Sequence, residues 1–250
     1  MLSLDGINAY IEGVHILRDV TLDIPAGSTV ALIGRNGAGK TSLLRTVMGF
    51  LPATGRIALD SADMAGVPAH KRPGLGIGYA PEDRRLFPAF TVEENIRLPG
   101  EVAGLSRAER DSRLAAVYRL MPELREFASR GAGQLSGGQG KMAALARALM
   151  VGSKVVLLDE PFQGLAPALA NRYAEVLRTL HEQHTEITLL ITESNPALLH
   201  SFAETTYTIE RGEVTRTRDK RAGGESADLS TAQPSGASGT PARSGQTPAM

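Results

Sequence analysis

The chain has 250 residues, which is enough for one α/β domain with a small second lobe and a sizeable core. Its 27 Lys and Arg residues balance 27 Asp and Glu residues, so the net charge gives no argument for a nucleic-acid partner. Cysteine is absent, which excludes disulfides and thiolate metal sites. The sequence has no run of roughly 18 or more apolar residues, so no membrane-spanning segment is expected.

Strands are expected at the start of the chain, because the first thirty residues alternate between apolar and polar side chains, as half-buried antiparallel strands do. The run 28–34 is nearly all apolar and ends in glycine, which predicts a strand covered on both faces. A helix is expected from Gly39 to about Met48. Further strands are expected over 56–60 and 76–80, with a polar, proline-rich loop between them.

The pattern becomes helical from about residue 84 to residue 150, between two buried strands, which predicts a separate helical lobe. The following residues predict buried strands over 155–159 and 186–192, a helix over 167–183, and a hairpin over 205–217 that turns at Arg211 and Gly212. This alternation indicates a mainly parallel sheet. Residues 218–250 contain few large apolar side chains, so they are expected to form a disordered tail.

Residues 34–41, GRNGAGKT, form a phosphate-binding pattern between a predicted strand and a predicted helix. Gly34, Gly37 and Gly39 let backbone N–H groups approach phosphate oxygens without a clashing Cβ. The helix that follows directs its positive end at the anion. Lys40 is expected at the β- and γ-phosphates, and the Thr41 hydroxyl is expected to bind Mg²⁺. The other nucleotide-binding positions predicted in this loop are Asn36 and Ser42.

The run VVLLDEP (155–161) places two acids at the end of a buried strand, where ligands collect in parallel sheets. Asp159 can hold the Mg²⁺ shell, and Glu160 can polarise an attacking water. The alternative is that both acids only cap a strand before the turn at Pro161. The presence of Lys40 favours the catalytic interpretation.

The run LSGGQ (135–139) is an unusual helix start. Ser136 is a good N-cap, but three glycines crowd the first turn, each costing about 1 kcal/mol relative to Ala. Bare backbone at a helix N-terminus suits a phosphate, and residues 34–41 already provide one phosphate site in this chain. We therefore expect Ser136, Gly138 and Gln139 to bind the nucleotide of a second chain.

In this order, the motifs GRNGAGKT, PEDRRLFPAFTVEEN, LSGGQ and VVLLDEP resemble those of an ATP-binding cassette (ABC) ATPase. Residues 79–96 and 164–167 more closely resemble the ATP-binding subunits of branched-chain (hydrophobic) amino acid importers. The resemblance covers roughly residues 1–217. It implies an α/β P-loop NTPase core with a mainly parallel sheet, an N-terminal antiparallel β subdomain and an α-helical subdomain inserted at about 84–150. It also implies hydrolysis of ATP with Mg²⁺.

The resemblance also assigns residues that no motif indicates alone. Tyr10 matches the aromatic residue that stacks on adenine, although a core tyrosine is the alternative. Glu82 stands where most cassettes have a glutamine that senses Mg²⁺ and the membrane subunit. Ser194 stands where most have a histidine that contacts the γ-phosphate. None of the five histidines fits that role: His15, His70, His181 and His184 are expected in loops or helices, and His200 beyond a strand.

The resemblance implies the energy-coupling ATPase of a membrane importer, bound to the cytoplasmic face of the membrane. Its expected partners are a second ABC ATPase subunit in a homo- or heterodimer, transmembrane permease subunits and, indirectly, a solute-binding protein, with no nucleic acid. The permease contact is expected around Glu82 to Phe90, although Phe87 and Phe90 can instead pack on the helical lobe. The alternatives are a soluble ABC ATPase that drives assembly and a slowly hydrolysing, nucleotide-gated subunit.

Overall fold

The computed structural model describes residues 1–195, 197–199 and 202–219. His200 and the tail predicted for residues 218–250 lie outside this part, except for residues 218 and 219 at the end of the last strand. A sheet at the N-terminus has the strand order β2-β1-β4-β5, and its pairs are antiparallel. Its strands are β1 (Leu2–Ile11), β2 (Val14–Ile24), β4 (Ala53–Leu59) and β5 (Ala62–Asp63). The predicted antiparallel β subdomain is therefore confirmed.

The second sheet has the strand order β10-β9-β3-β8-β7-β6, and only its edge pair β10–β9 is antiparallel. Its strands are β3 (Thr29–Ile33), β6 (Ile77–Ala80), β7 (Val155–Asp159), β8 (Thr188–Glu193), β9 (Thr205–Glu210) and β10 (Glu213–Asp219). Arg211 and Gly212 connect β9 to β10, with φ values of 50° and 85°, as a two-residue hairpin turn requires. The mainly parallel sheet is confirmed.

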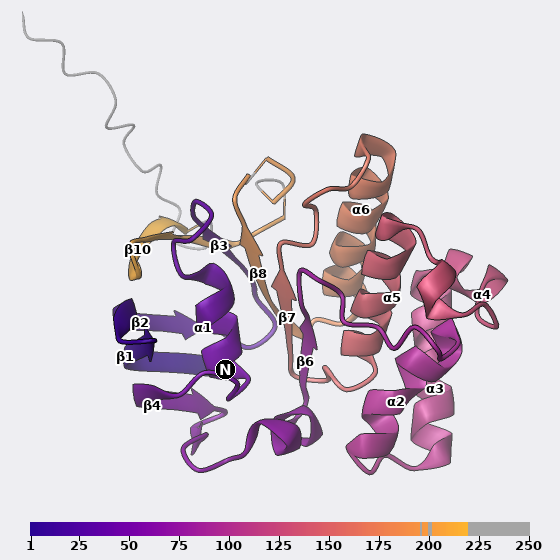
Figure 1. Cartoon of the computed structure of the whole chain (residues 1–250), viewed down its shortest axis with the longest axis horizontal. Helices are drawn as coiled ribbons and strands as arrows, with labels where there is room; N and C mark the ends of the chain where they lie inside the picture. The colour runs from indigo at the N-terminus through magenta and orange to yellow at the C-terminus, as the bar shows by residue number, and fades with distance from the viewer. Residues whose placement is uncertain (196, 200–201, 220–250) are drawn as a thin grey trace, which may run out of the picture.

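Helices cover both faces of the parallel sheet (Figure 1). The helix α1 (Lys40–Val47) lies between this sheet and the antiparallel sheet, while α5 (Gly137–Leu149) and α6 (Pro167–Gln183) cover the opposite face. The helices α2 (Val92–Val102), α3 (Arg107–Leu120) and α4 (Glu123–Glu126) lie beyond α5. Short 3₁₀ helices span Ala69–Leu75 and Ala132–Gln134. Among the described residues, no helix is long and apolar enough to cross a bilayer.

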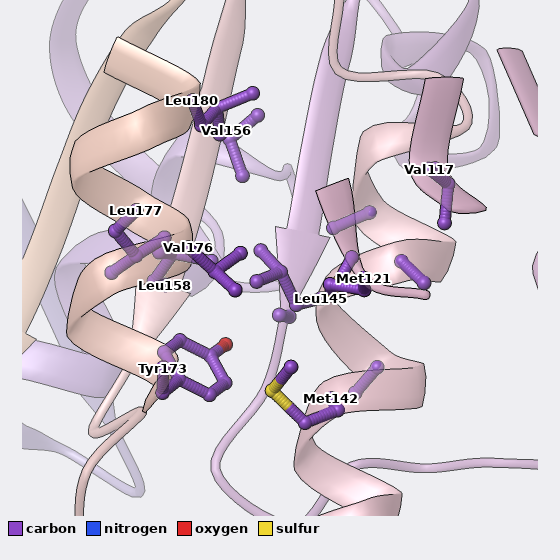
Figure 2. Close-up of a cluster of buried hydrophobic side chains, with 14 of the residues drawn as sticks. Val117, Met121, Met142, Leu145, Val156, Leu158, Tyr173, Val176, Leu177 and Leu180 are labelled. Atoms are coloured by element: carbon purple, nitrogen blue, oxygen red, sulfur yellow. The ribbon is translucent and has the colours of Figure 1, made fainter. Parts of the chain in front are cut away.

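Side chains of the parallel strands point alternately into two cores, as the period of two predicts. Val155 and Leu157 of β7 face the core around α1, and Val156 and Leu158 face the core under α5 and α6. Figure 2 shows the second core, where Leu145 of α5 lies between the two helices. These cores hold the ends of β3, β7 and β8 at one edge of the sheet.

Two local expectations were incomplete. β4 begins at Ala53, before the predicted strand 56–60, because the exposed residues Ala53 and Thr54 also pair with β1. The loop predicted after β4 contains β5 and a 3₁₀ helix. Arg72 of this 3₁₀ helix is buried and donates hydrogen bonds to the carbonyls of Thr46 and Val47, at the end of α1.

Candidate functional site

The loop 34–39 runs from the end of β3 to the start of α1 and curls around the ammonium of Lys40. Lys40 is the first residue of α1, and its Nζ donates to the carbonyl oxygens of Gly34 (2.6 Å) and Arg35 (3.0 Å). Gly39 is the N-cap with φ 115°, and no side chain caps the helix. The N–H groups at the start of α1 are thus open to an anion.

Glycine is required at the three positions 34, 37 and 39 of this loop for different structural reasons. Gly37 and Gly39 have φ values of 81° and 115°, which strain any residue with a Cβ. Gly34 has no positive φ, but a Cβ there would overlap the carbonyl oxygen of Ile209 in β9. Gly34 therefore permits the close packing of β9, a reason that the phosphate pattern did not reveal.

A cavity of about 440 Å³ opens in front of this loop. Most predicted nucleotide-site residues line it, including Lys40, Thr41 and Glu160. Its lining comprises Ile11, Ile16, Asn36, Gly37, Gly39, Lys40, Thr41, Ser42, Glu82, Glu160 and Gln163. The structure thus brings together four separate stretches of the sequence (11–16, 36–42, 82 and 160–163) at one edge of the parallel sheet.

Asp159 ends β7 and is held by three hydroxyl donors. Its Oδ1 accepts hydrogen bonds from Thr41 (3.1 Å) and Thr192 (2.8 Å), and its Oδ2 accepts one from Tyr79 (3.2 Å). Burial raises the pKa of Asp159, while these hydrogen bonds oppose the shift. Within the described residues no group of three or more His, Cys, Asp or Glu could hold a metal ion. A Mg²⁺ ion here would therefore combine the oxygens of Thr41 and Asp159 with phosphate and water, a donor set that suits this ion.

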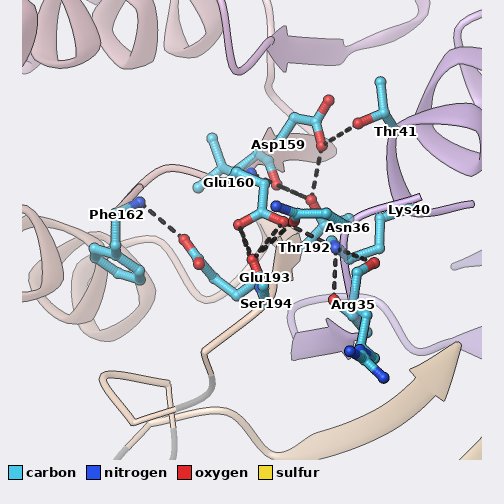
Figure 3. Close-up of polar contacts among 12 residues, drawn as sticks. Arg35, Asn36, Lys40, Thr41, Asp159, Glu160, Phe162, Thr192, Glu193 and Ser194 are labelled. Carbon is cyan, nitrogen blue, oxygen red and sulfur yellow. Dashed lines mark hydrogen bonds and ion pairs between the residues drawn. The ribbon is translucent and has the colours of Figure 1, made fainter. Parts of the chain in front are cut away.

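Glu160 follows Asp159 and is held between Lys40 and Ser194 (Figure 3). Its Oε1 lies 2.9 Å from Lys40 Nζ, and both of its carboxylate oxygens lie 3.0 Å from Ser194 Oγ. Burial raises the pKa of Glu160, but the hydrogen bond and charge of Lys40 outweigh burial and leave this pKa below its ordinary value. Ser194 therefore reaches the carboxylate that the sequence identified as the water-polarising group.

Glu193 is a site residue that sequence reasoning missed. It is buried at the end of β8, and its Oε1 accepts a hydrogen bond from the backbone N–H of Phe162 at 2.8 Å (Figure 3). Burial, together with the nearby charge of Glu160, raises the pKa of Glu193 to about 8. The available signal was an acid that ends a buried strand next to Ser194.

Tyr10 lies near the C-terminal end of β1, and the residue is 55% exposed. The ring stacks on His15 of β2, with centroids 4.4 Å apart and planes inclined by 11°. The expectation that His15 lies in a loop or helix is wrong, because Tyr10 and His15 face each other across the antiparallel ladder. The next residue, Ile11, lines the cavity. The adenine-stacking role of Tyr10 remains a prediction.

The signature residues 135–139 are not part of the lining of this cavity in the described chain. Ser136 caps α5 through a capping box: its Oγ accepts from the Gln139 N–H, and Gln139 Oε1 accepts from the Ser136 N–H. A Cβ at Gly138 would overlap the side chain of Leu169, and one at Gly140 would crowd Arg84. Packing thus explains two of the glycines for which the sequence had suggested a phosphate-binding reason, whereas a Cβ at Gly137 would approach only Arg84 Nη1, at 4.0 Å.

A second cavity of about 730 Å³ lies beside the first, between the sheet and α2. Thr41 and Glu82 line both cavities, so the two spaces meet at these residues. Phe50, Phe87 and Val102 also line the second cavity and are 51%, 49% and 69% exposed. About half or more of each of these apolar residues is therefore exposed in the single chain.

The family model and the most similar known proteins indicate the same family. Residues 17–163 match the family model described as ABC transporter. The high-affinity branched-chain amino acid transport ATP-binding protein BraG of Pseudomonas aeruginosa is 35% identical over 86% of this chain and 91% of BraG. The probable branched-chain amino acid transport ATP-binding protein LivF of Archaeoglobus fulgidus is 34% identical over 86% of this chain and 90% of LivF.

Other similar proteins differ in their described solute or state. The Fe(3+) ions import ATP-binding protein FbpC 2 of Rhodococcus jostii is 37% identical over 85% of this chain but only 60% of its own length. A dimeric post-hydrolysis structure of the ATP-binding cassette MJ0796 bound to ADP and Pi has a TM-score of 0.77 and 25% identity. The alignment covers 88% of this chain and 99% of that one.

Proposed function

Because this chain belongs to the ABC transporter family, we propose that it is the ATP-hydrolysing subunit of a membrane importer for branched-chain or other hydrophobic amino acids. The predicted ABC ATPase fold and activity are confirmed. The observation that carries the proposal is the cluster at the open end of α1, in which the buried pair Lys40 and Glu160 meets the exposed Ser194.

Hydrolysis requires Lys40 to exchange its partner. The phosphates of ATP replace Glu160 as the main anion beside Lys40, and the N–H groups of residues 37–40 bind phosphate oxygens. Glu160 then accepts a proton from water as the water oxygen attacks the γ-phosphorus. The bond from the γ-phosphorus to the bridging oxygen breaks, and ADP and phosphate leave. Ser194, which already contacts both Glu160 oxygens, orients this carboxylate.

Mg²⁺ would be held by Thr41 and Asp159, whose oxygens already lie 3.1 Å apart. When bound, this ion offsets negative charge on the β- and γ-phosphates. Glu82 lies where the two cavities meet, and its carboxylate can accept a hydrogen bond from a metal-bound water. Glu82 therefore connects the nucleotide site to the second cavity.

Two such subunits meet head to tail, so that Ser136, Gly138 and Gln139 of one bind the ATP held by Lys40 of the other. The exposed position of Gly137 and the N-terminus of α5 support this assignment. The dimeric structure of a similar cassette also supports it. ATP binding closes the dimer, and hydrolysis with product release reopens it.

The second cavity is the proposed docking site for the transmembrane permease subunits. Its exposed Phe50, Phe87 and Val102 provide apolar area for a partner segment. Binding there would place this chain peripherally on the cytoplasmic face of the membrane. A movement of Glu82 would then transmit changes at the nucleotide site to the permease.

The proposed solute rests on BraG and LivF, both described as branched-chain amino acid transport ATP-binding proteins. FbpC 2, described with Fe(3+) import, supports a second candidate, and the chain spans 60% of its length. Uptake measurements separate these solutes.

The test uses a strain lacking this gene and complemented with the wild type or with Glu160→Gln at equal expression. We expect the wild type to restore uptake of labelled leucine, and Glu160→Gln to fail. Restored uptake of ferric iron without leucine uptake would contradict the proposed solute. Normal uptake of both solutes in the deletion strain, with only soluble proteins co-purifying with the tagged chain, would contradict the importer.

A further inference from the structure

Lys141 joins the signature helix to the site of its own chain. It lies one turn into α5, just behind residues 135–139, and is half-buried. Its ammonium donates a hydrogen bond to the backbone carbonyl oxygen of Glu160. The carboxylates of Glu193, Glu82 and Glu160 also lie close enough to act electrostatically on it. A cation from α5 is therefore held against the loop that carries the hydrolytic carboxylate.

The backbone of Glu160 needs such support. Its φ of 46° lies in the left-handed region, which is strained for a residue with a Cβ. Its N–H donates to the carbonyl oxygen (3.1 Å) and hydroxyl (3.2 Å) of Thr192. Its carbonyl accepts from Gln163 N–H at 3.2 Å and from Lys141. Lys141 is thus the contact that ties this strained backbone to a separate helix.

The same helix also holds a second strained turn. Arg147 of α5 donates to the carbonyl oxygens of Arg84 (2.8 Å) and Arg85 (2.6 Å), whose φ values are 63° and 48°. Gly140 leaves room for Arg84, because a Cβ at this position would lie 3.0 Å from Arg84 Cδ. Two basic side chains of α5 therefore fix the turns beside Glu160 and Glu82.

We propose that Lys141 is a positioning residue that couples the signature end of α5 to Glu160 in the same chain. The inference rests on the proposed shared site, in which this end of α5 binds the ATP held by the partner subunit. A shift of α5 on that ATP reaches the Glu160 backbone through the Lys141 hydrogen bond. Each subunit thereby orients its own carboxylate according to the occupancy of the other nucleotide site.

The test compares Lys141→Met, which keeps the apolar stem and removes the donor, with Lys141→Arg in the assembled complex. We expect Lys141→Met to lower kcat by roughly ten- to a hundredfold, with KM within about threefold of the wild type. The Hill coefficient for ATP should fall toward about 1. Lys141→Arg should recover most of both values, because it retains a cationic donor. Wild-type kcat and Hill coefficient in Lys141→Met would overturn the proposal.

Lys154→Met is the matched control, since Lys154 pairs with Asp60 on the surface at 2.7 Å. It should leave kcat and the Hill coefficient unchanged. A kcat loss in Lys141→Met that only follows the unfolded fraction, measured by thermal unfolding, would also overturn the proposal. Glu160→Gln distinguishes a failure of the proposed nucleotide site from a failure of the proposed coupling through Lys141. Full turnover in Glu160→Gln contradicts the proposed site itself, whereas an inactive Glu160→Gln beside a normal Lys141→Met contradicts only the coupling.

Discussion

Lys40 Nζ and Glu160 Oε1 lie 2.9 Å apart, and the two side chains are only 5% and 3% exposed. Burying two charges is costly unless each keeps further partners. Lys40 has them in the carbonyls of Gly34 and Arg35, and Glu160 has one in Ser194. The ion pair holds both side chains in place until a phosphate of ATP replaces Glu160 beside Lys40.

Lys40→Ala should weaken ATP binding by at least about tenfold, because the phosphates lose a charge-assisted hydrogen bond. Fluorescence titration with a nucleotide analogue measures this loss. The substitution also leaves Glu160 buried and unpaired, so the protein should become less stable. The double variant Lys40→Ala/Glu160→Gln should regain stability but not affinity. Unchanged affinity in either variant would contradict the role of Lys40.

Ser194→Ala should lower kcat about fivefold at nearly constant KM, since one hydrogen bond to Glu160 contributes about 1 kcal/mol. Steady-state hydrolysis in the assembled complex measures both constants. The exposed Ser112→Ala in α3 serves as the control. An unchanged kcat would show that Ser194 does not orient Glu160, and a large rise in KM would indicate a binding role instead.

Glu193 predicts a pH dependence of stability. Its pKa is raised from 4.5 to about 8 in the fold, so the folded state favours the protonated carboxyl. This contribution is fully present below the unfolded pKa and is lost as pH rises through the folded pKa. The free energy of unfolding should therefore fall, relative to Glu193→Gln, between pH 4.5 and about 8. Urea unfolding without nucleotide tests this, and parallel curves for both proteins would contradict it.

Arg72→Met should destabilise the protein by about 2–4 kcal/mol, because it removes a buried cation that caps the end of α1. The guanidinium donates to Thr46, Val47, Val67 and Met64 carbonyl oxygens. Urea unfolding measures the loss, with the exposed Arg119→Met in α3 as the control. Equal stability of the two variants would contradict the capping role.

Local patterns predicted most of the fold. The helix expected over 167–183 is α6, and the hairpin expected at Arg211 and Gly212 is present, because amphipathic period and turn residues act locally. Contacts between distant segments escaped prediction. The close packing of Ile209 leaves no room for a Cβ at Gly34, and Leu169 leaves none at Gly138. No pattern within the motifs reveals these contacts.

The same limit applies to the site. Lys40, Thr41, Asp159 and Glu160 follow from motifs, and the structure brings them together. Lys141 and Glu193 belong to no motif, and their relevance depends on the packing of α5 and β8 around Glu160. Ser194 was identified only because it stands where most ABC ATPases have a histidine. Its hydrogen bond to the Glu160 carboxylate became visible only in the structure, where it directly follows β8.

In the proposed dimer, each nucleotide site is completed by a second subunit. Ser136→Arg tests it through two readouts, ATP affinity of the isolated subunit and turnover of the assembled complex. Ser106→Arg, which removes a similar capping box from α3, controls for lost helix capping. We predict that Ser136→Arg keeps subunit affinity within about twofold and loses turnover, whereas Ser106→Arg keeps both. Loss of subunit affinity in Ser136→Arg equal to that in Lys40→Ala, or full turnover in the complex, would contradict the claim.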